Sequence, residues 1–430
     1  MTGVYVRRRG RETGGCSVLL DTSTNLLTAE QKFKREFGSI TSLEADLLLL
    51  AAAIYAADRC IKRGEREESP RDLEIFVPVI NVGILQPVVP CIELVLRKLS
   101  SDSWRIHLRQ EAGTLEKRNK PVSAPGKTLL FSGGLDSLAA AIELGETIQG
   151  LHLVSHFTHN QATASAQTQL VYLLAKKLKM SLPHHRFLVS AKSGASPSKV
   201  RFDSESSQRT RSYLFLTLGA LCARRIGHNE VLVIAENGQM AIHLPITQGR
   251  IGPYSTRTAH PEILQMMAQV LNPVLGTDLA FVNPYVDETK AEVVKRVWNA
   301  LPEAIPISIS CWKSARLPRS ATHCGFCIPC IIRRIAIEHW CADPTAYARD
   351  LFSETFAALS ADDAGRRNLA DYAEFMLRVE STDNSEVTVE WPELVTPPVV
   401  ASKAIDMYRR AAKETRKVFS KYPGLTLLLQ

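Results

Sequence analysis

A glycine-rich loop between a buried strand and a helix is the feature that most constrains the fold of this chain. The apolar segment 128–131 runs into SGGLDS at 132–137, and a helix is expected over 136–146. Two adjacent glycines permit a tight turn and a close approach of the backbone to a ligand. The N–H groups at the start of such a helix lack partners and attract anions. The loop therefore predicts a phosphate site at the end of a strand.

The side chains of this loop add a metal ion to the prediction. Ser132 and Ser137 can donate from their hydroxyls, whereas Asp136 would repel a phosphate unless Mg²⁺ lay between them. A Walker-type P-loop is excluded, because Pro121 occupies the place of its first glycine and the GKT triplet at 126–128 precedes the strand. A tight turn with a well-capped helix is the remaining alternative.

Short apolar segments alternate with amphipathic ones from residue 127 onward. This alternation is typical of βαβ units and predicts an α/β fold with a parallel sheet covered by helices. The carboxyl ends of parallel strands meet at one edge of a sheet, so we expect the active site there. Strands are expected over 128–131, 150–157, 185–189 and 230–235, and helices over 136–146, 164–178 and 210–225.

Three regions are predicted along the chain. Residues 1–122 are expected to form an N-terminal α+β domain, 123–342 the α/β domain, and 343–430 a C-terminal helical region that ends in a basic helix over 402–421. A polar, proline-containing linker at 116–127 marks the first boundary. In the N-terminal domain a helix is expected after Pro90, and another one opens with the capping-box spacing of Thr41 and Glu44. Its expected strands are 4–7, 17–20, 75–79 and 104–108.

Four cysteines are closely spaced near residue 320. Cys311, Cys324, Cys327 and Cys330 have the spacing C-x12-C-x2-C-x2-C, which suits a closed, structural Zn²⁺ site. An iron–sulfur cluster uses similar spacing and stays open as an alternative, and His323 could replace one ligand. The other five cysteines are scattered and are interpreted as packing residues.

Charge and hydropathy narrow the class of protein. The net charge of +8 and the pI near 9.0 permit a nucleic acid, nucleotide or acidic protein partner, or only a solvated basic surface. The arginines near the N-terminus precede no apolar signal-peptide core. The longest apolar run, 47–57, is too short to cross about 30 Å of hydrocarbon. We therefore expect a cytoplasmic protein with no membrane contact.

The two motifs together resemble a known family. The region from about 127 to 337 resembles QueC, the 7-cyano-7-deazaguanine synthase family of PP-loop ATP pyrophosphatases, which have an adenine nucleotide alpha hydrolase-like fold. The segments that carry the resemblance are LLFSGGLDSLAA, RSYLFLTL from Arg211, NPY at 283–285 with TKAE at 289–292, and SCW with the downstream CGFCIPCIIR.

This resemblance implies roles for individual residues. It assigns ATP binding to Ser132, Gly133, Gly134, Asp136 and Ser137, and Zn²⁺ to the four cysteines. It places Arg211 near a phosphate or the activated carboxylate and Lys290 near the nucleotide, so that both join Asp136 as catalytic residues. A surface ion pair is the alternative interpretation of Arg211, Lys290 and Arg333.

The resemblance also implies a reaction. In this family ATP adenylates the carboxylate of 7-carboxy-7-deazaguanine with release of pyrophosphate, ammonia gives an amide, and a second ATP converts the amide to a nitrile. Positioning and cationic stabilisation would carry the catalysis, and no protein nucleophile is needed.

Two departures from the family pattern alter the expectation. The usual NAVDYSGYPDCR-like substrate segment is replaced by AENG at 235–238 and GPYSTR at 252–257, which makes Glu236, Asn237 and Arg257 the candidate substrate contacts. The added terminal regions resemble the longer QueC-like proteins of antiphage defence, such as QatC. That resemblance implies partner proteins from a defence operon and transfer of the activated carboxylate to a partner-protein amine instead of ammonia.

Two other functions stay open. A tRNA-modifying PP-loop enzyme would account for the basic charge, but sulfur-transfer members need a further cysteine, and only Cys222 lies on an expected core helix. A scaffold that binds a nucleotide without catalysis is the other alternative.

Overall fold

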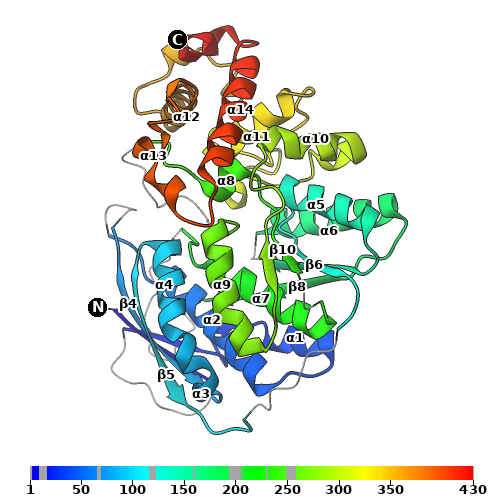
Figure 1. Cartoon of the computed structure of the whole chain (residues 1–430), viewed down its shortest axis with the longest axis vertical. Coiled ribbons are helices and arrows are strands. Elements are labelled where there is room, and N and C mark those ends of the chain that lie inside the picture. The colour runs from blue at the N-terminus through cyan, green and yellow to red at the C-terminus, as the bar shows by residue number, and fades with distance from the viewer. Residues whose placement is uncertain are drawn as a thin grey trace.

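The computed structural model describes residues 2–8, 17–64, 69–115, 123–157, 160–192, 205, 207–228, 231–247 and 258–429. N-terminal, central and C-terminal parts of the chain follow one another along the long axis of the molecule (Figure 1). Candidate substrate residue Arg257 and the segment 252–257 lie outside the described residues.

The central part contains a five-stranded sheet. Its order is β11-β10-β6-β7-β8, and every neighbouring pair is parallel, which confirms the α/β prediction. The central strand β6 ends where the glycine-rich loop begins. The strands of this sheet are β6 (Lys127–Leu130), β7 (Leu151–Phe157), β8 (His184–Leu188), β10 (Val231–Val233) and β11 (Ala280–Val282), and the short strand β9 (Ser190–Ala191) lies outside it. The helices are α5 (Leu135–Thr147), α6 (Gln161–Leu178), α7 (Arg211–Ile226), α8 (Gly238–Ile242), α9 (Pro261–Leu275), α10 (Lys290–Ala300) and α11 (Ile328–Glu338).

Each face of the central sheet is covered by its own hydrophobic core. Successive side chains of a strand point to opposite faces. Leu129 and Phe131 accordingly pack with α5, α6 and α10, whereas Leu130 packs with α7 and α9. The short strand β6 is therefore buried on both faces. Because β6 is the central strand, the loop that follows it lies at the middle of the sheet edge.

The N-terminal part differs from the expected α+β arrangement. Its sheet has the order β2-β1-β4-β5 with parallel pairing throughout, because helices α2 and α4 carry the chain back before β4 and β5 begin. The expected capping box is present, since Thr41 and Glu44 satisfy each other's backbone N–H groups. The strands are β1 (Thr2–Arg7), β2 (Val18–Asp21), β3 (Leu26–Leu27), β4 (Asp72–Val79) and β5 (Ser103–Gln110). The helices are α1 (Glu30–Phe37), α2 (Ser42–Cys60), α3 (Val82–Leu85) and α4 (Val89–Ser100), the last with Pro90 in its first turn.

Helix α2 joins the N-terminal part to the central one. Its apolar run is buried on all sides, as a uniformly apolar helix should be, and it packs against α7 within one continuous core. The two-stranded β3-β9 ladder adds a second connection. The predicted boundary after residue 122 remains a prediction, and 116–122 lie outside the described residues.

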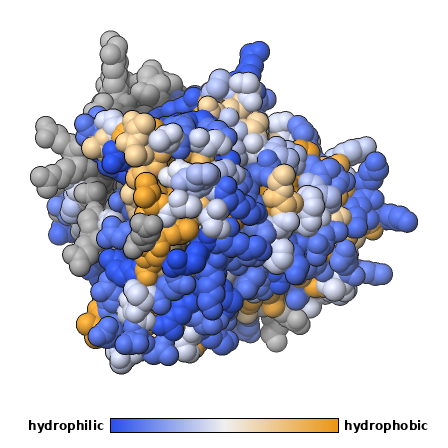
Figure 2. Space-filling model, turned by 90° about the horizontal axis from the view of Figure 1, so that it is seen from above, coloured by the Kyte–Doolittle hydropathy of each residue, from blue (hydrophilic) through white to orange (hydrophobic). Residues whose placement is uncertain are grey.

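The C-terminal part is helical, as predicted. It contains α12 (Ala364–Ser381), α13 (Val387–Glu390) and α14 (Ala401–Phe419), followed by a short helical segment, Pro423–Leu429. Helices α12 and α14 share a core with α8 and α11, so they cover the end of the central part (Figure 1). On α14, Ile405, Ala412 and Phe419 are buried while Lys413 and Lys417 are exposed. Seen from this end, the surface is mostly hydrophilic (Figure 2).

No described helix is long and apolar enough to span a membrane.

Candidate functional site

The glycine-rich loop is supported by two neighbouring segments. Gly133 has φ 86°, and a Cβ atom there would lie 3.1 Å from the Gln167 side chain, so this position requires glycine. Gln167 Nε2 donates to the Ser132 carbonyl (3.2 Å), and the Ile309 amide donates to the Gly133 carbonyl (3.0 Å). Two neighbouring segments thus fix the loop in place.

The polar groups of the loop do not cap the helix that follows. Gly134 is the N-cap of α5, and its own amide donates to Ser132 Oγ (3.3 Å), but no side chain of the described residues caps the amides that follow. Ser132 Oγ and Ser137 Oγ lie 3.2 Å apart, and Ser137 Oγ donates to the Gly134 carbonyl (3.1 Å). The interpretation as a merely well-capped turn is therefore wrong in its capping part, since the N-terminal amides of α5 have no side-chain partner. Such amides suit a phosphate.

A buried ion pair lies beside the loop. Lys290 Nζ is 2.7 Å from Asp136 Oδ2, and the lysine is only 6% exposed. Asn237 Nδ2 donates to the same oxygen (3.2 Å). Asp136 lies in the first turn of α5, Lys290 begins α10, and Asn237 caps α8. The alternative of a surface ion pair for Lys290 is wrong, because the pair is buried against the loop.

Two carboxylate oxygens in this region are buried and have no hydrogen-bond partner among the described residues. They are Asp136 Oδ1 and Glu236 Oε2. Burial, and then the neighbouring charge of Asp136, raises the pKa of Glu236 to about 8, while Lys290 opposes the shift. A buried acceptor without a partner is costly unless a ligand completes it.

Asn283 fixes the backbone that presents Glu236. Its Oδ1 accepts from the Glu236 amide (3.1 Å), and its Nδ2 donates to the Glu236 carbonyl (2.8 Å). Asn237 has both of its polar side-chain atoms engaged, because its Oδ1 also accepts from the Met240 amide. Glu236 therefore offers a free polar atom to a ligand in this structure, whereas Asn237 orients Asp136.

Arg211 begins α7 and lies beside the end of the neighbouring strand β7. Its Nε donates to His156 Nδ1 (3.2 Å), and a terminal nitrogen donates to the His156 carbonyl (3.3 Å). Burial and the Arg211 charge lower the pKa of His156 to about 3, so this imidazole is neutral at pH 7. No described carboxylate pairs with Arg211, and the ion-pair alternative does not hold for it. Tyr55 of α2 packs edge-on against His156.

The four cysteines form a compact cluster. All four are buried, and their sulfur atoms lie within 4.8 Å of one another. Cys311 Sγ accepts from the amides of Lys313 (3.3 Å) and Cys324 (3.4 Å). Backbone donors of this kind stabilise thiolates, and four sulfurs close a tetrahedral shell, so the cluster could bind zinc as a structural ion.

His323 does not belong to this cluster, so its proposed place as a substitute ligand is wrong. Its Nε2 accepts from the Ser310 amide (3.1 Å), and its Nδ1 contacts Thr322 Oγ1 (2.9 Å). Burial, and then the Arg333 charge, depresses its pKa.

Arg333 connects the cluster to the phosphate loop. Its fully buried guanidinium donates to the Ile305 carbonyl (2.6 Å) and to hydroxyls of Ser308 and Ser310. The interpretation as a surface ion pair is wrong here too. Because Ile309 donates to the loop, Arg333 holds the segment that reaches from the cysteines to the loop.

The structure thus unites most of the predicted residues at one sheet edge. Ser132, Gly133, Gly134, Asp136, Ser137, Glu236, Asn237 and Lys290 surround the end of β6 and β10, with Arg211 next to them at β7. The prediction omitted His156, although a polar residue at the end of a buried strand could have indicated it. Cys222 is fully buried on α7 and its pKa is raised by burial, which argues against a sulfur-transfer role.

Comparison with known families agrees with this arrangement. Residues 127–341, half of the chain, match the family model described as queuosine biosynthesis protein QueC. In a comparison with curated proteins, no match was found. The matched region contains the phosphate loop, Lys290 and all four cysteines. The chain belongs to the QueC family, whose PP-loop synthases use ATP in 7-deazaguanine-type chemistry.

Proposed function

We propose that this protein is a ligase that adenylates the carboxylate of a 7-carboxy-7-deazaguanine-type substrate and then transfers the acyl group to an amine. The observation that carries the proposal is the buried Asp136–Lys290 pair beside an uncapped helix start. A substrate carboxylate oxygen attacks the α-phosphorus of ATP, and the bond from that phosphorus to the bridging oxygen breaks. Pyrophosphate departs, leaving an acyl adenylate.

The residues of the chain supply positioning and charge for this step. The amides of Gly133 and of the first turn of α5, with the hydroxyls of Ser132 and Ser137, hold the phosphates, and Lys290 stabilises the charge on the departing pyrophosphate. Arg211, at the start of α7 and fixed by His156 of β7, faces the activated carboxylate. The amine then attacks the carbonyl carbon, AMP leaves, and the amine loses a proton to solvent.

The site fits Mg²⁺. Asp136 Oδ1 is buried without a partner, and a carboxylate oxygen is the ligand that this ion prefers. Asp136 would hold the ion between itself and the phosphates. When bound, Mg²⁺ neutralises the negative charge that gathers there.

Recognition of the base is proposed to rest on Glu236 and Arg257. The unpartnered Glu236 Oε2 can accept from the N–H groups of a guanine-like ring. Zn²⁺ on the four cysteines is proposed as a structural ion only, since four sulfurs leave no open position.

The acceptor is proposed to be an amine on a partner protein of an antiphage defence operon, and the site of action the cytoplasm. The support is the large part of the chain outside the family match, which includes α2, α12 and α14. The cysteines of the described residues are free, which suits a reducing compartment.

Mass spectrometry tests the proposal directly. The purified chain is incubated with ATP, carboxydeazaguanine and either ammonia or cell extract, and pyrophosphate is measured in parallel. Acid-dependent pyrophosphate release that is lost in Asp136→Ala is expected, with a protein adduct in the extract sample. Release that is equal without the acid, or equal in Asp136→Ala, would contradict adenylation at this loop.

A further inference from the structure

Gln239 is the residue at which the C-terminal helices reach the candidate active site. It lies on α8, two residues after Asn237, and is 6% exposed. Its Oε1 accepts from the backbone amide of Lys290 (3.0 Å), and its Nε2 donates to the Tyr372 hydroxyl (3.2 Å). One amide side chain therefore joins α12 to the first residue of α10.

Helix α14 also contacts α8 and the residue that precedes α10. The Tyr408 hydroxyl donates to the Gln239 carbonyl (3.1 Å) and accepts from the Leu244 amide (3.0 Å). Thr289 Oγ1, immediately before Lys290, donates to Glu414 Oε1 (2.7 Å). Both ends of α8 and the start of α10 are thus attached to the C-terminal helices.

The packing at this contact leaves little room for adjustment. A Cβ atom on Gly238 would lie 2.8 Å from the Met407 side chain and 2.3 Å from the Val286 carbonyl. Glycine at this position lets α8 approach both α14 and the turn that precedes α10. The approach brings Gln239 within reach of Lys290.

The chemistry of Gln239 suits a residue that positions a charge without altering it. The first amides of a helix have no partner within the helix, and Gln239 supplies one for Lys290. A carboxylate at this place would add a second negative charge near Asp136. The neutral amide avoids that charge and still both accepts and donates.

Apolar packing alone would have held these helices together without the free-energy cost of removing polar groups from water. Buried hydrogen bonds stabilise a fold by little more than that cost. Most of the side chains that pack between α8, α11, α12 and α14 are apolar. A polar chain through such a core fixes one geometry, because its hydrogen bonds are satisfied in that geometry only.

We propose that Gln239, together with Tyr372, is a positioning residue that holds Lys290 against Asp136, so that the C-terminal helices are part of the catalytic unit. The inference rests on the proposed function, because Lys290 is assigned there to the departing pyrophosphate. Lys290 has a long, flexible side chain, and a small rotation of the first turn of α10 would move its ammonium group away from the loop.

Steady-state kinetics of pyrophosphate release by the full chain test this role. Gln239→Met keeps the volume but removes both hydrogen bonds, and Tyr372→Phe removes one hydroxyl. The loop amides that bind ATP do not contact either residue, so we expect kcat to fall about 10- to 100-fold while the KM for ATP changes less than about threefold. A purely structural role would lower the amount of folded enzyme and leave KM and the kcat per folded molecule unchanged.

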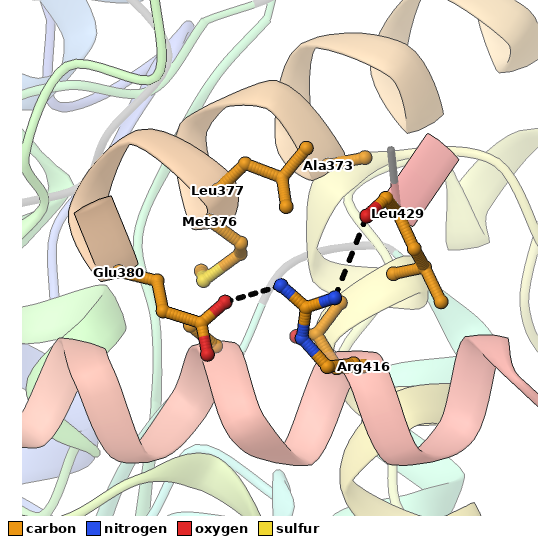
Figure 3. A pocket seen from close by; sticks show the side chains of 8 residues that line it. Ala373, Met376, Leu377, Glu380, Arg416 and Leu429 are labelled. Carbon is orange, nitrogen blue, oxygen red and sulfur yellow. Dashed lines mark hydrogen bonds and ion pairs between the residues drawn. The ribbon is translucent and has the colours of Figure 1, made fainter. Parts of the chain in front are cut away.

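The matched control lies elsewhere on the same helix pair. Arg416 of α14 contacts Glu380 of α12 (2.5 Å) and the Leu429 carbonyl (3.4 Å) beside a small pocket (Figure 3). Arg416→Gln loosens the contact between α12 and α14 without touching Gln239 and should keep the wild-type kcat. An equal loss in Arg416→Gln would show that general loosening of the helices, not Gln239, controls the rate.

A second measurement does not depend on turnover. Limited acetylation followed by peptide mass spectrometry gives the labelling rate of Lys290 relative to Lys295, which is exposed on the same helix. In the wild type the buried ion pair should keep Lys290 slow, and Gln239→Met and Tyr372→Phe should accelerate it severalfold. If the wild type released no pyrophosphate, the proposed function would fail while the labelling still tested the positioning. Unchanged labelling, or faster labelling with unchanged kcat, overturns the inference.

Discussion

The cysteine cluster and the phosphate site are built in opposite ways. The cluster takes its four ligands from one stretch of 20 residues, Cys311 to Cys330, and backbone amides of the same stretch support the sulfurs. The candidate phosphate site is assembled from α5, α8, α10 and the ends of β7 and β10, and the partners Asp136 and Lys290 are 154 residues apart. The structure of a local site depends mainly on its bound ligand. The geometry of an assembled site depends on the contacts that hold its separate helices and strands in place.

The largest expected effect comes from breaking the local site. Cys327→Ser removes one of four thiolates, and structural zinc contributes directly to folding, so we expect loss of about one zinc ion per chain together with a large fall in thermal stability. Elemental analysis and calorimetry measure both. Cys341→Ser is the control, because Cys341 is half-buried and outside the cluster. Retained zinc and stability in Cys327→Ser would refute the structural role.

The assembled site should instead lose activity while it keeps its fold. Lys290→Met removes the charge beside Asp136, and the loss of a transition-state cation typically costs roughly 100- to 1,000-fold in kcat. Lys295→Met, on the exposed side of the same helix, should leave the rate unchanged. Pyrophosphate release measures the effect, and a nearly normal rate in Lys290→Met would remove this lysine from the reaction.

The same contrast explains what could be predicted from the sequence. The four cysteines and the loop at 132–137 are local, so spacing alone was enough to predict a site at each of them. Alternating strands and helices gave the central parallel sheet, but the parallel pairing of β1, β2, β4 and β5 was missed because local patterns do not encode strand direction. His156 and Gln239 were missed for a related reason. Their roles depend on partners, Arg211 and Tyr372, that lie 55 and 133 residues away.

A buried carboxyl group on α14 should make the free energy of unfolding depend on pH. Burial raises the pKa of Glu414 to about 7, with Glu292 adding to the shift while Thr289, Arg410 and Lys417 oppose it. The folded chain then binds this proton more tightly than the unfolded chain. The contribution of Glu414 to stability should therefore fall as the pH rises from about 4.5 to 7 and stay level above that, by roughly 3 kcal/mol in total.

Glu414→Gln checks this source of the slope. The amide can still accept from Thr289 but carries no titrating proton. Denaturant unfolding between pH 5 and 8 should show a flatter profile for Glu414→Gln than for the wild type. Glu380→Gln, a more exposed carboxylate on α12, should keep the wild-type slope. Identical slopes in wild type and Glu414→Gln would exclude Glu414 as the cause.

The smallest expected effect comes from a substitution in the glycine-rich loop, the part of the assembled site that is contiguous in the sequence. Gly133 has φ 86°, and a methyl group there would lie 3.1 Å from the Gln167 side chain. Gly133→Ala should therefore destabilise the loop conformation that binds the phosphates by about 1–2 kcal/mol. We expect ATP affinity to fall about tenfold, measured by calorimetry, with zinc content unchanged. Gly83→Ala is the control, because nothing lies within 4 Å of an added Cβ there. A wild-type affinity in Gly133→Ala would mean that the loop can shift its backbone, and the phosphate site would then depend on its distant partners alone.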